Sequence, residues 1–141
     1  WIAFLSTRDD PTGQVPEVYR MRADGSEQAR VTRLPGRKSI PTWSPDGTEI
    51  WFTLHPASDQ GAESDDEIHA VRIADGHVRN VTRHPRSDEH AQFAPDGGLL
   101  LFDSSRDGDA LQLYVMRPDA SALRRVLTST AMDFWGSIVR R

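Results

Sequence analysis

Four side chains that could bind a divalent metal lie close together in the second half of the chain. They are two imidazoles and two carboxylates, His84, Asp88, Glu89 and His90. Such nitrogen and oxygen donors are common ligands of divalent metals. The same residue types are also typical of a loop that anchors the start of a strand, which is the simpler interpretation. We therefore assign no metal to this group.

A second candidate is an acidic segment from Pro56 to Glu67, which also contains serine and glycine. Its carboxylates are Glu63, Asp65, Asp66 and Glu67. A run of this kind could bind Ca²⁺, but it lacks the ordered ligand spacing of a dedicated calcium loop. We expect a solvated loop. If this segment has a role, we expect it to contact a partner rather than a metal.

No motif of a catalytic nucleophile is present. The chain has no cysteine, which excludes disulfides, thiolate zinc sites and cysteine nucleophiles. Trp135-Gly136-Ser137 does not form a Gly-x-Ser-x-Gly elbow. No spacing positions a serine, a histidine and an aspartate as a triad, and there is no phosphate-binding glycine loop. We predict a protein that is not an enzyme and that needs no cofactor.

Charge and apolar patterning exclude two further classes. The net charge is −4, with 21 acidic and 17 basic residues, whereas nucleic-acid binders usually carry a basic surface. The longest apolar run, residues 99–102, is far shorter than the roughly 20 residues of a membrane-spanning helix. We expect no nucleic-acid partner and no membrane span.

An internal repeat determines where these residues lie. The segment Pro41–Gly47 recurs as Ala91–Gly97, and Val31–Arg33 recurs as Val81–Arg83, each 50 residues further along the chain. A period near 50 is typical of β-propeller blades. Short runs of β-branched and aromatic residues alternate with tight turns such as Pro45-Asp46-Gly47, which indicates four strands in a complete copy.

The sequence therefore predicts an all-β fold, a β-propeller segment of three four-stranded blades. Repeat 1 covers about residues 1–38 and lacks its first strand, repeat 2 covers 39–88, and repeat 3 covers 89–135. Residues 136–141 would begin the first strand of a following or swapped blade. In repeat 2 we expect strands at residues 40–44, 49–54, 67–73 and 77–82. Trp43 and Phe93 are expected to pack between blades.

These motifs, with Ile50-Trp51-Phe52 and Leu113–Met116, resemble the repeat of TolB-like β-propellers, a WD-repeat-like class. The resemblance covers nearly the whole chain, although Ala94 replaces the usual serine and the acidic loop is long. It implies the fold more than a function, because similar repeats occur in propellers of prolyl-oligopeptidase-type peptidases and of metal-dependent lyases. By family analogy, a periplasmic or extracellular location is expected.

We expect a non-catalytic binding or scaffold module that holds a protein or peptide on its loop face or in its central channel. The candidate partner-binding residues lie on first strands and in the loops around them: Arg37, Thr42, Asp65, Asp66, His84, Asp88, His90 and Gln92. Two alternatives stay open. One is the propeller of a prolyl-oligopeptidase-type serine peptidase without its catalytic domain, and the other is a metal-dependent propeller lyase or hydrolase.

The number of blades raises the question of assembly. Closed propellers contain about four to eight blades, so three blades leave two faces uncovered. The leading hypothesis is a homodimer of three-bladed halves that forms a six-bladed ring. Residues 136–141 of one copy would then complete the first blade of the other. The alternative is that the missing blades come from further sequence of a longer propeller.

Overall fold

In the computed structural model, β-strands form all of the regular secondary structure of the described residues, 1–57, 66–108, 110–127, 131–134 and 136–139. The strands are β1 (Ile2–Ser6), β2 (Glu17–Met21), β3 (Ala29–Arg30), β4 (Arg37–Trp43), β5 (Glu49–His55), β6 (Glu67–Arg72), β7 (Val78–Asn80), β8 (Asp88–Phe93), β9 (Leu100–Ser104), β10 (Gln112–Met116) and β11 (Arg124–Arg125). Within those residues, no helix is long and apolar enough to cross a membrane. The predicted all-β class is confirmed.

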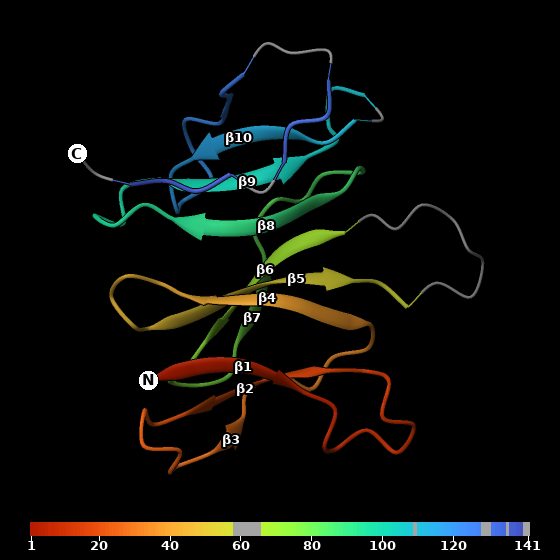
Figure 1. Cartoon of the computed structure of the whole chain (residues 1–141), viewed down its shortest axis with the longest axis vertical. Coiled ribbons are helices and arrows are strands. Elements are labelled where there is room, and N and C mark those ends of the chain that lie inside the picture. The colour runs from red at the N-terminus through yellow and green to blue at the C-terminus, as the bar shows by residue number, and fades with distance from the viewer. Residues whose placement is uncertain (58–65, 109, 128–130, 135, 140–141) are drawn as a thin grey trace.

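The strands form three antiparallel sheets that lie one above another along the long axis of the molecule (Figure 1). Blade 1 contains β1-β2-β3, blade 2 contains β4-β5-β6-β7, and blade 3 contains β8-β9-β10-β11. The predicted propeller blades are therefore present. In blade 2 the observed strands agree with the expected ranges, except that β4 begins earlier, at Arg37, and β7 is shorter. The boundaries of the repeats stay predictions.

A β-bulge interrupts the first strand of blade 2 and of blade 3 at the same position. The register of β4 on β5 shifts between Ser39 and Thr42, and that of β8 on β9 shifts between Glu89 and Gln92. Inside each bulge one residue has a positive φ, 50° at Ile40 and 57° at His90. A bulge changes the direction of the side chains around it. These two short segments therefore determine on which face of the sheet the side chains of each first strand lie.

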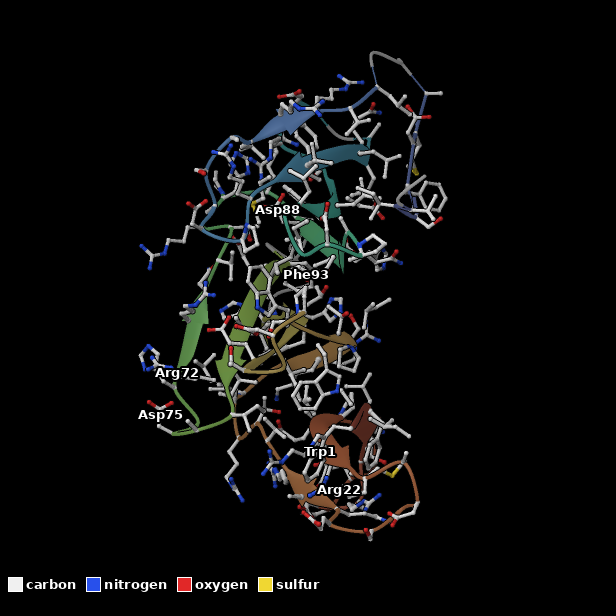
Figure 2. The ribbon with its side chains drawn as sticks, turned by 90° about the vertical axis from the view of Figure 1, so that its left-hand side faces the viewer. Trp1, Arg22, Arg72, Asp75, Asp88 and Phe93 are labelled. Atoms are coloured by element: carbon white, nitrogen blue, oxygen red, sulfur yellow. The ribbon has the colours of Figure 1, made fainter. Side chains whose placement is uncertain are left out.

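Aromatic residues pack between the blades as the sequence predicts. Trp43 contacts a buried cluster that includes Val18 of blade 1 and Phe52 of blade 2. Phe93 of blade 3 contacts Trp51 of blade 2 edge to face, with ring centroids 5.0 Å apart. Figure 2 shows Phe93 at the boundary between these two sheets. This packing buries the faces through which neighbouring blades meet.

Buried charges are paired where the first strands begin. Lys38 is 1% exposed, and its Nζ lies 3.1 Å from Glu17 Oε2 of blade 1. At the position 50 residues later, Asp88 is fully buried and accepts two hydrogen bonds from Arg106 Nη2, at 2.9 and 2.8 Å. The repeat therefore carries opposite charges at one position, and each charge has its own partner.

Removing Arg106 should destabilise the fold strongly. Arg106→Ala leaves the carboxylate of Asp88 buried without its countercharge, which should cost about 3–5 kcal/mol in the free energy of unfolding. Arg72→Ala is the matched control, because Arg72 and Asp75 form an ion pair in which both side chains are about half exposed (Figure 2). The control should lose less than about 1 kcal/mol. Urea unfolding measures both values, and equal losses would contradict a structural role for the buried pair.

Candidate functional site

Polar side chains of blades 2 and 3 gather near the start of the first strands β4 and β8, and these two strands begin on the same side of the molecule (Figure 1). We call this group the interblade polar cluster, and its members are Ser39, His55, Asp66, Glu89, His90 and Asp103. Ser39 lies on β4, His55 is the last residue of β5, and Asp66 precedes β6. The other three lie on β8 and β9 of blade 3.

On the blade 2 side, three of these residues form one hydrogen-bonded series. Ser39 Oγ lies 2.8 Å from His55 Nε2, and His55 Nδ1 lies 2.7 Å from Asp66 Oδ2. An ionised carboxylate only accepts hydrogen bonds, so Nδ1 is the donor to Asp66. When the ring is neutral, Nε2 accepts the Ser39 hydroxyl. Asp66 is buried, and among the described residues its second oxygen, Oδ1, has no hydrogen-bond partner.

On the blade 3 side, His90 Nδ1 lies 2.8 Å from Asp103 Oδ2. Its other ring nitrogen, Nε2, lies 3.6 Å from Glu89 Oε2. The backbone N–H of His90 donates a hydrogen bond of 3.3 Å to Thr53 Oγ1 of blade 2. The bulge that holds His90 at a positive φ therefore also joins the two blades at this site.

The environment of Glu89 connects the two halves of the cluster electrostatically. Burial raises the pKa of Glu89 above its ordinary value of 4.5. The negative charges of Asp66 and Asp103 raise this pKa further, whereas His90 and His55 lower it. Glu89 therefore holds its proton to a higher pH than an exposed glutamate does, and when protonated it can donate a hydrogen bond.

The structure brings two of the predicted partner-binding residues, Asp66 and His90, into this cluster. Asp88 lies beside it but is fully buried, and Arg106 holds its carboxylate, so its observed role is to support the start of β8. His84 is also part of the local framework, because its Nδ1 accepts a hydrogen bond of 3.2 Å from the backbone N–H of Arg86.

The remaining predicted residues are not members of the cluster or lie outside the described residues, although Arg37 pairs with His55 in the sheet register. Arg37 is exposed at the start of β4, and Thr42 and Gln92 follow the two bulges. Asp65 is outside the described residues. Partner binding by any of these positions stays a prediction. In the part of the chain that the structure describes, no three His, Asp or Glu side chains are arranged to hold a metal ion.

Sequence reasoning missed Ser39, His55 and Asp103. A signal for two of them exists in the repeat itself, because the positions 50 residues after Ser39 and His55 carry Glu89 and Ser105. Polar residues that differ between otherwise similar blades mark where the two blades have different surroundings or roles. The three residues of the blade 2 series are at positions 39, 55 and 66, and only strand pairing in the folded chain brings them together. No motif of fixed local spacing therefore reveals them.

The comparisons with known proteins agree with the observed fold. The family model of the TolB beta propeller domain matches residues 2–139. The chain is 28% identical over 117 residues to the Tol-Pal system protein TolB of Anaeromyxobacter dehalogenans, covering 83% of this chain and 25% of that protein. It is 24% identical over 136 residues to the uncharacterised peptidase YuxL of Bacillus subtilis, covering 74% of this chain and 20% of that protein. The chain thus spans a quarter or less of the length of these curated relatives.

A solved structure shows the same architecture. The putative TolB of Agrobacterium tumefaciens superposes with a TM-score of 0.69 at 23% sequence identity, over 88% of this chain and 44% of that chain. At this identity the likeness supports the fold alone.

The raised pKa of Glu89 predicts a pH-dependent effect of its replacement. Ionised Glu89 destabilises the folded state, and this penalty appears as the pH rises above 4.5 and through the raised pKa of the folded state. Glu89→Gln should therefore be more stable than the wild type at pH 8, and the difference should vanish near pH 4. Urea unfolding at both pH values measures this.

Gln92→Ala, on the same strand without a titratable group, is the control and should show no such change. A Glu89→Gln protein that loses the same stability at both pH values would contradict the proposed electrostatic penalty.

Proposed function

Because the chain belongs to the TolB β-propeller domain family, we propose that it is a binding module that holds a protein or peptide segment at the interblade polar cluster. The observation that supports this proposal is the cluster itself, a group of polar side chains that two blades contribute at positions where their sequences differ. First strands line the central channel of a closed propeller, so a partner in the channel or at its mouth would meet β4 and β8. No catalytic step is part of this proposal.

The exposure of the cluster suits it for contact. The side chains of His55, His90 and Glu89 are 16%, 17% and 19% exposed. Neighbouring side chains hold the ring nitrogens of both histidines, so a partner would share or displace one of these contacts. Preorganised polar groups of this kind bind a partner with little loss of side-chain entropy. The imidazoles and the carboxyl would form hydrogen bonds with the backbone or polar side chains of an extended segment.

A second candidate function follows from the similarity to a peptidase. In that case the chain would be the propeller of a prolyl-oligopeptidase-type enzyme, and catalysis would belong to another domain. The complete gene distinguishes the two, because an α/β-hydrolase sequence pattern beside the propeller would favour the peptidase. A metal-dependent lyase or hydrolase has less support, since the described histidines and carboxylates form no metal-ligand group.

The location and the assembly are further parts of the proposal. Family analogy supports a periplasmic or extracellular location. In the described residues β1 has no strand on its outer side. Ile2, its first residue, and the preceding Trp1 are 39% and 47% exposed. An open edge and exposed apolar side chains favour cover by further strands. A second copy that forms a six-bladed homodimer would provide this cover, as would further blades of a longer protein.

Peptide selection tests the binding proposal. A phage-displayed library of short linear peptides is panned against the immobilised chain, and the affinities of enriched peptides are measured by calorimetry. His90→Asn retains a residue type that tolerates a positive φ and should weaken binding roughly tenfold or more. Arg117→Ala, in the exposed turn after β10 at the opposite end, should leave the affinity unchanged. Peptides that bind both variants as well as the wild type would place the binding site elsewhere.

Light scattering coupled to size-exclusion chromatography tests the assembly. A homodimer would elute with twice the 15.8 kDa mass of the chain, because the open β1 edge and the apolar residues beside it become covered. Replacing Ile2 with Lys should shift the equilibrium toward the monomer. A folded wild-type monomer across the accessible concentrations would contradict the homodimer.

A further inference from the structure

The hydrogen-bonded series at Ser39 has the connectivity of an activated serine. We propose that Ser39 is a nucleophile, with His55 as its general base and Asp66 as the positioning residue, and that it reacts with ester-type carbonyl compounds that enter the interblade polar cluster. This activity goes beyond the binding function and does not depend on it.

The geometry assigns each atom a role. A serine triad requires the hydroxyl on one imidazole nitrogen and a buried carboxylate on the other. Here Ser39 Oγ is 2.8 Å from Nε2 of His55, and Asp66 Oδ2 is 2.7 Å from Nδ1. Both distances are in hydrogen-bond range, and Asp66 is 5% exposed. The carboxylate therefore fixes the tautomer in which Nε2 is free to accept the proton of Ser39.

Blade 3 forms without an equivalent of this series. It repeats the bulge and the strand pairing of blade 2, yet the equivalents of Ser39 and His55 are Glu89 and Ser105. Two blades of the same topology therefore differ at these positions, and the series is particular to blade 2.

The backbone next to Ser39 is strained. Ile40 has a φ of 50°, a conformation that a β-branched residue rarely adopts. Strain of this kind is concentrated at functional sites, and the other bulge residue of the cluster, His90, shares it with a φ of 57°. The bulge that contains Ile40 places Ser39 directly opposite Thr53 in the sheet register.

Thr53 provides a hydrogen-bond donor for a developing oxyanion. Its Oγ1 accepts a hydrogen bond from the backbone N–H of His90, and a hydroxyl that accepts one bond can still donate its own proton. Directly paired residues of an antiparallel sheet have Cβ atoms about 5 Å apart. An oxyanion formed on a carbonyl bound to Ser39 would thus lie within reach of the Thr53 hydroxyl.

The reaction balances with water as the only co-reactant. Ser39 Oγ forms a bond to the carbonyl carbon while its proton passes to Nε2 of His55. The bond from that carbon to the leaving alcohol then breaks, and the alcohol takes the proton from Nε2. Water attacks the acyl group on Ser39 by the same route, which releases a carboxylic acid and restores the hydroxyl. The ionised Asp66 stabilises the imidazolium in both steps.

An alkyl fluorophosphonate is the test probe, because an activated serine displaces its fluoride and retains the phosphonyl group. The folded chain should gain one adduct, which peptide mapping places on Ser39, and Ser39→Ala should gain none. His55→Gln should slow labelling at least roughly 10³-fold. Ser105→Ala, at the blade 3 equivalent of His55, is the control and should react at the wild-type rate. Hydrolysis of p-nitrophenyl acetate should change in parallel.

Asp66 is tested by a readout that general destabilisation does not change. The ¹⁵N chemical shifts of the His55 ring report its tautomer, and Asp66→Asn should move the proton from Nδ1 toward Nε2 and slow labelling together. Circular dichroism confirms that each variant is folded. The proposal is overturned if the folded wild type gains no adduct on Ser39, or if His55→Gln is labelled as fast as the wild type. Peptide binding by Ser39→Ala is a separate measurement, so this proposal and the binding proposal can fail independently.

Discussion

The bulge in the first strand is the constraint on which the rest of the arrangement depends. Without it, Ser39 and Trp43 would lie on the same face of β4, because side chains alternate along a strand. The extra residue instead pairs Ser39 with Thr53 and Trp43 with Ile50, so that the two side chains lie on opposite faces. Trp43 can then pack toward blade 1 while Ser39 lies on the face that contacts blade 3. One irregularity thus serves both the packing and the site.

This also explains how much of the structure the sequence predicts. The repeat reveals the blades, and the aromatic residues after each bulge are correctly placed between them, because both depend on spacing along the chain. Asp66 and His90, predicted as partner contacts, lie in the interblade polar cluster, and their role in binding stays a prediction. Ser39 and His55 are missed, because their contact depends on a change of register that no local pattern reveals. Asp88 is proposed as a partner contact, whereas the structure shows it buried against Arg106.

The charges at the start of the first strands show how a repeat tolerates change. Lys38 and Asp88 are equivalent in position and opposite in charge, and both are buried. The lysine pairs with the preceding blade through Glu17, whereas the aspartate pairs with Arg106 of its own blade. A buried charge needs a partner, but the fold does not dictate from which blade the partner comes. At the position of Lys38 and Asp88, the structure thus requires that the buried charge has an opposite charge beside it, and not that the residue is of one type.

The division of the cluster between two blades has a consequence for the repeat. Blade 2 contributes Ser39, His55 and Asp66, and blade 3 contributes Glu89, His90 and Asp103. Ser39 and Glu89 occupy the same position of the repeat, so two identical copies could not supply both. The cluster therefore belongs to the junction between two unlike blades, and a single sequence repeated without change would not form it.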